Sequence, residues 1–123
     1  MRFHPGLAFA ALMLMGATPA FAQANCEAPI PPAAPDGRTA TQAQITAAVT
    51  DAKNFISQSD VYQTCLLDYV RTQKEQAATD KKPFDTYIET TIQKQVDSNQ
   101  AAKVRAGQEI NAAVNDYKMS HPK

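Results

Sequence analysis

The sequence predicts an all-α protein: a long antiparallel two-helix hairpin, coiled-coil-like, with an N-terminal proline-rich extended arm tethered to it by a disulfide. Apolar residues recur at alternating spacings of three and four over one long segment and lie on a broad face of a second, which is the pattern of helices packed against each other. A short polar turn followed by a proline separates these segments. The arm is predicted from four closely spaced prolines and from the two cysteines of the chain.

Residues 1–22 have the layout of a secretory signal peptide. Arg2 supplies a positive start, residues 7–17 are apolar apart from one glycine, and Ala20-Phe21-Ala22 is an A-x-A cleavage site. The apolar run is about half of the roughly 20 residues that a membrane-spanning helix needs. We therefore expect cleavage after Ala22, with Ala24 as the second candidate, and a periplasmic or secreted protein with no stable membrane insertion after cleavage.

The two cysteines are predicted to pair. Cys26 and Cys65 allow one intramolecular connectivity, and thiols exported to an oxidising compartment form disulfides. Two free thiols or an intermolecular bridge are the alternatives. Lipidation of Cys26 is disfavoured because residues 23–25 lack the aliphatic and small pattern of a lipobox.

Residues 23–40 are predicted to form the extended arm, which favours polyproline II geometry at Pro29, Pro31, Pro32 and Pro35. At about 3.1 Å per residue, the arm can run back along a first helix that rises 1.5 Å per residue and reach Cys65. Asp36-Gly37 marks a turn. We expect Ile30 and the proline rings to pack on Val61, Tyr62 or Tyr69.

The hairpin is predicted over residues 41–118. Its first helix, about 41–78, starts with a capping box of Thr41 and Gln44. A break near Ser59-Asp60 is the alternative, but the apolar stripe runs through that segment unbroken. The predicted seam positions are Ile45, Ala48, Ala52, Phe55, Ser59, Tyr62, Leu66, Tyr69 and Gln73.

The second helix is predicted over about 83–118, followed by a tail at 119–123. Pro83 suits a first helical turn, and Asp85 there complements the helix dipole. A turn near residue 80 places Phe55 opposite Gly107. The glycine then either makes room for the Phe55 ring or occupies a tolerant surface position.

Polar residues interrupt the seam at Ser59 and Asn99. A buried polar residue can fix the register of paired helices, and we expect this role for Asn99, with Tyr62 or Ser59 as its partner.

The apolar stripe is wider than one partner helix and an arm can cover. We expect a partly exposed interaction surface made of Val49, Ile56, Val70, Phe84 and Tyr87. Its partner would be an unknown envelope protein or a second copy, because two hairpins can close into a four-helix bundle.

The side-chain inventory argues against catalysis. His121 is the one histidine after the signal peptide, so a Ser-His-Asp arrangement and a multi-histidine metal site are not expected. Asp85 and Glu89 share a helical face and could bind a hard cation, but acidic residues are favoured at a helix start in any case. The 12 Lys and Arg are interspersed with 12 Asp and Glu, so there is no basic stripe for nucleic acid.

The signal peptide, the Cys-Pro-rich start, the PDG turn and VYQTCL within a long helix together resemble uncharacterised small secreted α-helical proteins of Gram-negative bacteria. The resemblance implies an exported, helical, disulfide-linked protein and carries no activity. We therefore expect a non-enzymatic protein without cofactors that acts through protein contacts in the cell envelope, as an adaptor, inhibitor or chaperone-like factor. The alternative is a small-ligand or cation-binding periplasmic module that uses the inter-helix aromatic groove or Asp85 and Glu89.

Overall fold

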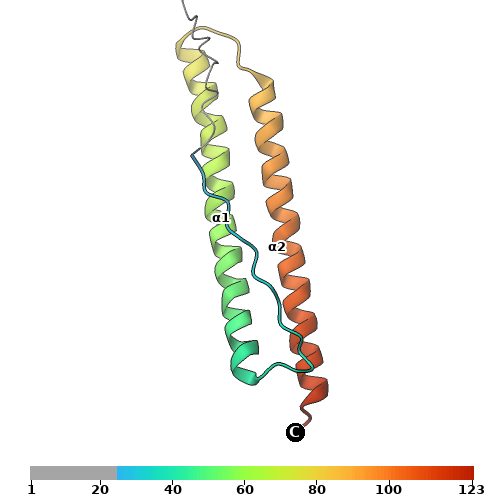
Figure 1. Cartoon of the computed structure of the whole chain (residues 1–123). Coiled ribbons are helices and arrows are strands. Elements are labelled where there is room, and N and C mark those ends of the chain that lie inside the picture. The colour runs from blue at the N-terminus through green and yellow to red at the C-terminus, as the bar shows by residue number, and fades with distance from the viewer. Residues whose placement is uncertain (1–24) are drawn as a thin grey trace, which may run out of the picture.

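The computed structural model describes residues 25–123, and the predicted signal peptide, residues 1–22, lies outside them. Two α-helices, α1 (Gln42–Thr79) and α2 (Thr86–Ser120), pack side by side in opposite directions (Figure 1). The described residues contain no strand. The predicted all-α class and the pairing of two long helices are confirmed.

The start of α1 is fixed by the capping box that the sequence predicted. The Thr41 N–H donates to Gln44 Oε1 at 2.8 Å, and the Gln44 N–H donates to Thr41 Oγ1 at 3.2 Å, so two backbone donors at the helix end are satisfied reciprocally. The helix then runs without a break to Thr79. Ser59, where a break was the alternative, is completely buried against α2.

The connection between the helices is longer than predicted. Lys81 adopts a left-handed conformation with φ 53°, and α2 begins only at Thr86. The Asp85 carboxylate accepts the Tyr87 N–H at 2.9 Å, which makes Asp85 the N-cap. The expectation that Pro83 lies in the first helical turn is therefore wrong, because the cap forms two residues after it.

The core is a narrow seam between the helices. One cluster consists of Tyr62, Leu66, Val70 and Ile92, and a second consists of Ala40, Ile45 and Ala113. The buried residues of α2 repeat every seven positions, at Ile92, Asn99, Ala106 and Ala113, as they do when one helix faces another along its length.

The segment before α1 lies along the hairpin instead of extending from it. In Figure 1 it starts beside the middle of α1, crosses over to the C-terminal part of α2 and turns back to the start of α1. Burial along it repeats every three residues, with Cys26, Pro29, Pro32 and Pro35 half-buried, which is the period of a polyproline II helix. Ile30 is 88% exposed, so the expectation that it packs on the helices is wrong. The side chain of Ile30 points outward because Ile30 lies between Pro29 and Pro32, the positions that face the helices.

Candidate interaction surface

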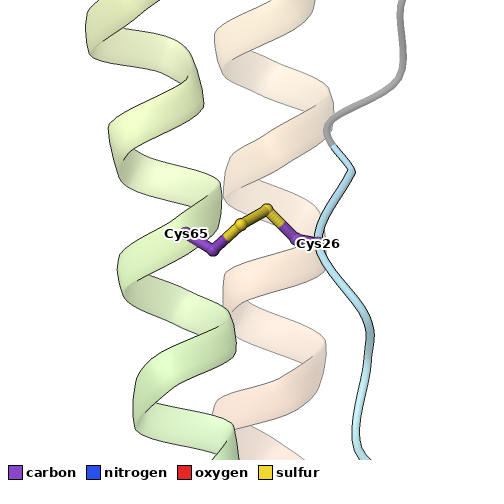
Figure 2. The surroundings of a disulfide bond; sticks show 2 residues. All are labelled: Cys26 and Cys65. Atoms are coloured by element: carbon purple, nitrogen blue, oxygen red, sulfur yellow. A yellow bond between two sulfur atoms is a disulfide. The ribbon is translucent and has the colours of Figure 1, made fainter.

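A disulfide joins Cys26 to Cys65 (Figure 2), which is the predicted pairing. The two Cα atoms are 5.9 Å apart. Cys26 packs against the cluster that contains Tyr62 and Leu66. The bond therefore fixes the first end of the arm, residues 25–40, to the middle of α1.

Gly37 anchors the other end of the arm on α2. A Cβ atom added there would lie 2.0 Å from the Ala113 carbonyl oxygen and 2.9 Å from Asp116 Cβ, so only glycine permits this approach. Asp36 holds the turn, because its carboxylate accepts the Arg38 N–H at 3.0 Å and its carbonyl accepts the Ala40 N–H at 2.9 Å. The arm is thus attached at both ends, to a different helix at each.

The arm covers one face of the hairpin. An open groove of about 400 Å³ lies beside Pro29 and is bordered on α2 by Thr91, Gln95, Ser98 and Ala102. A second groove of similar size lies beside Gly37 and is bordered on α2 by Glu109, Ala112 and Asp116. These α2 residues follow one another at spacings of three, four and seven, which keeps them on one side of the helix. That side is the one that faces the arm.

Polar side chains connect the two helices along another line. Lys74 pairs with Glu89 at 2.6 Å, and Lys103 pairs with Asp60. The two α1 residues are fourteen positions apart, and so are the two α2 residues. The helices therefore keep one antiparallel register over two heptads.

That register identifies the residues between the two ion pairs. Leu67 lies seven positions from both Asp60 and Lys74, and Val96 lies seven positions from both Lys103 and Glu89. Leu67 is 52% exposed. An apolar pair therefore separates the two ion pairs, and its α1 member faces solvent.

A second line of facing residues on the two helices is identified by the hydrogen bond that Gln63 Nε2 donates to Gln100 Oε1 at 3.3 Å. One heptad further, the same register places Ile56 opposite Gly107. A second step places Val49 opposite Val114. All four of these residues are half-buried.

The space beside Gly107 is open, because no neighbouring atom lies within 4 Å of a Cβ added there. Gly107 therefore does not make room for the Phe55 ring, and the surface explanation is the correct one. The ring, which is 2% exposed, lies in the seam one position before Ile56.

We name the face opposite the arm the arm-free surface. Val104, which is 51% exposed, belongs to it because it lies four positions, about one helical turn, after Gln100. Ile110 belongs to it because it lies one heptad after Lys103. It is made of Val49, Ile56, Leu67, Val96, Val104, Gly107, Ile110 and Val114.

The predicted interaction residues divide between three places. Val49 and Ile56 lie on the arm-free surface and are half-buried. Val70 is only 8% exposed, because it packs in the cluster with Ile92, so its expected exposure is wrong. Phe84 is half-buried against the same cluster. Tyr87 is 71% exposed in the first turn of α2.

The polar residues of the seam form one connected group. Asn99 Nδ2 donates to Ser59 Oγ at 3.1 Å, and Gln63 Nε2 donates to Asn99 Oδ1 at 2.9 Å. Tyr62 is buried nearby, but within residues 25–123 the partners of the Asn99 side chain are Ser59 and Gln63. The prediction named Ser59 correctly and missed Gln63. Gln63 lies one heptad before Val70, and this spacing could have indicated that its side chain reaches α2.

The titratable residues singled out from the sequence have structural partners. Asp85 caps α2, and Glu89 pairs with Lys74. His121 stacks on Tyr117 with ring centroids 4.3 Å apart. Over the described part of the chain, no three His, Cys, Asp or Glu side chains are grouped so that they could hold a metal ion.

No protein-family model, curated protein or solved structure matches the chain. Neither α1 nor α2 has the length of apolar sequence that crossing a membrane requires, and this holds for residues 25–123.

Proposed function

We propose that this chain is an exported, non-enzymatic helical protein that acts through protein–protein contacts in the cell envelope, as an adaptor, inhibitor or chaperone-like factor. The arm-free surface is its contact site. One observation carries the proposal: the arm occupies one face of the hairpin and leaves apolar side chains on the other, with Leu67 52% and Val104 51% exposed.

Two paired helices need cover on both faces of their seam, because an α-helix with a wide apolar stripe buries it only against a second layer. The arm supplies that layer on one face. Apolar side chains gathered on one face of a small protein commonly mark an interaction site. A partner protein supplies the missing layer on the arm-free surface.

Export is supported by the disulfide. A bond between Cys26 and Cys65 forms and persists in oxidising compartments such as the periplasm. A location in the periplasm or outside the cell also agrees with the signal-peptide layout of residues 1–22.

The test is cross-linking in living cells with a photoreactive amino acid. We expect Leu67 or Val104, when replaced by the photoreactive residue, to give covalent adducts with protein. Val61 is the matched control: it is apolar and 70% exposed, but it lies four positions before Cys65, on the flank of α1 that carries the arm. Equal adduct yields at Leu67 and Val61, or none at either arm-free position, would contradict the proposal.

A second candidate function is supported by the groove beside Pro29. The groove has a volume of about 400 Å³ and is lined by Tyr62, Asn99 and Lys94, and such a mixture of aromatic and polar residues is typical of small-ligand sites. A small-molecule screen by NMR tests it. Binding there would shift the amide signals of Lys94 and Ser98 and leave that of Leu67 unchanged, whereas a screen without such shifts would remove this candidate.

A further inference from the structure

We propose that the occupant of the arm-free surface is a second copy of this chain, so that two hairpins close face to face into a four-helix bundle. This inference rests on the proposed function, because it names the partner of the same surface. Each copy keeps its arm on the outside of the bundle.

The dimensions of the hairpin suit a second hairpin. α1 has 38 residues and α2 has 35, so a face two helices wide measures roughly 1,000 Å², because a helix rises 1.5 Å per residue and is about 10 Å across. A stable interface needs about 800 Å² per partner. A second hairpin covers both helices at once, whereas a single helix would leave part of the face uncovered.

The charges of this face permit contact with itself. Lys103 is paired with Asp60, and Lys74 with Glu89, within one chain. A second copy therefore meets neutralised pairs and no one-signed field that would repel it. Without residues 1–22 the chain loses only Arg2 among its charged residues and has a formal net charge of −1 at pH 7, so long-range repulsion between copies is small, a condition that favours association.

The face carries projecting apolar side chains, at Leu67 and Val104, and also an open space at Gly107. Gly107 leaves open space opposite Ile56, with Ile110 beside it. In a two-fold dimer each copy offers both the projecting apolar side chains and the gap that receives them, which is what an isologous contact requires. Helix pairs in four-helix bundles meet in this manner, with side chains inserted between those of the facing helix.

The test is the solution mass of the oxidised chain without its signal peptide, measured by sedimentation equilibrium over a range of concentrations. We expect twice the mass of one chain. We also expect Leu67→Glu to raise the dimer dissociation constant at least about tenfold, because each dimer then buries two added carboxylates. Val104→Glu, on the other helix, should do the same, and Val61→Glu is the matched control that leaves the constant unchanged. Far-UV circular dichroism checks that each variant remains helical.

A mixture of ¹⁵N-labelled and unlabelled chains locates the contact. After photo-cross-linking at Leu67, cross-linked peptide pairs with one labelled and one unlabelled member come from two different chains. These pairs should join the arm-free surface of one chain to that of the other. A chain that stays monomeric to millimolar concentration would overturn the inference. A dimer that is insensitive to Leu67→Glu and Val104→Glu, or one that is broken by Val61→Glu, would do so as well.

The two proposals fail separately. If the purified chain is monomeric but Leu67 still cross-links to a different protein in cells, the second copy is excluded and the contact surface stands. If Leu67 and Val104 give no adduct of any kind in cells, the contact surface itself is excluded.

Discussion

Removing the disulfide should cost a large share of the stability of this chain. The bond joins residues separated by 39 positions, and the chain-entropy model gives about 4 kcal/mol at 25 °C for a loop of that length. Domains of this size lose roughly 4–8 °C of melting temperature per kcal/mol, so the double variant Cys26→Ala/Cys65→Ala should melt at a temperature lower by roughly 15–30 °C.

The assay is urea unfolding followed by far-UV circular dichroism at one fixed protein concentration, which matters because association adds to apparent stability. The chain reduced with dithiothreitol is the matched control, because it loses the same bond without a substitution. It should show the same decrease as the double variant.

The slope of the unfolding free energy against urea concentration distinguishes this effect on the unfolded chain from a local loss of packing in the folded chain. Without the bond the unfolded chain is less constrained and exposes more surface, so the dependence of the unfolding free energy on urea should become steeper. A decrease below about 1 kcal/mol, with an unchanged slope, would show that the bond does not act by constraining the unfolded chain, since the chain-entropy model predicts about four times that value.

Four further substitutions each change a single residue, and the free energy of unfolding of each variant is measured by urea unfolding at fixed protein concentration. Asn99→Ala should lower the free energy of unfolding by about 1–3 kcal/mol, because the buried Ser59 hydroxyl loses its donor; no measurable loss would contradict a connected polar seam. Gly37→Ala should cost about 1–3 kcal/mol, because its Cβ overlaps the backbone of α2. Gly107→Ala, measured at a concentration where the chain is monomeric, should instead stabilise by about 0.5–1 kcal/mol, because alanine is the better helix former and meets no neighbour within the chain; equal effects at the two glycines would contradict the description of the arm. Ile30→Ser should change stability by less than about 0.5 kcal/mol, since Ile30 is 88% exposed, and a larger loss would mean that it packs on the helices after all.

The two helices were predictable because their evidence is local. The capping box at Thr41 and the three-and-four spacing of apolar residues depend on neighbours within one helix. The burial of Ser59 and Asn99 followed from the same spacing, since both fall on the line that faces the other helix. The pairing of Cys26 with Cys65 was predictable because each cysteine has one possible partner in the chain, thiols pair in an oxidising compartment, and the extended arm is long enough to bring them together.

Residue burial at the edges of the seam was not predictable from spacing. Val49, Ile56 and Val70 occupy the same heptad position, yet only Val70 is buried, because it packs against Ile92 whereas Ile56 lies opposite Gly107. The outcome depends on the partner across the seam, which the sequence of one helix does not contain. Leu67 was missed for a related reason. The sequence alone does not show which residue of α2 it faces, and this became known only when the ion pairs on either side of it fixed the register of the two helices.

The arm contained a signal that the prediction did not use. Cys26, Pro29, Pro32 and Pro35 are spaced by three, which is one turn of polyproline II, and these four positions face the helices. The same spacing places Ile30 outward. The contact of Gly37 with Ala113 left no comparable trace, because a close approach between distant segments is visible only after both are positioned.

The arm covers one face of the hairpin and leaves the opposite face bare. Nuclear Overhauser spectroscopy of the oxidised chain tests this arrangement most directly. We expect cross-peaks from Cys26 to Tyr62 or Leu66 and from Gly37 to Ala113, and none from any arm residue to Leu67 or Val104. Cross-peaks from the arm to Leu67 or Val104, or an arm without contacts to either helix, would contradict this placement of the arm.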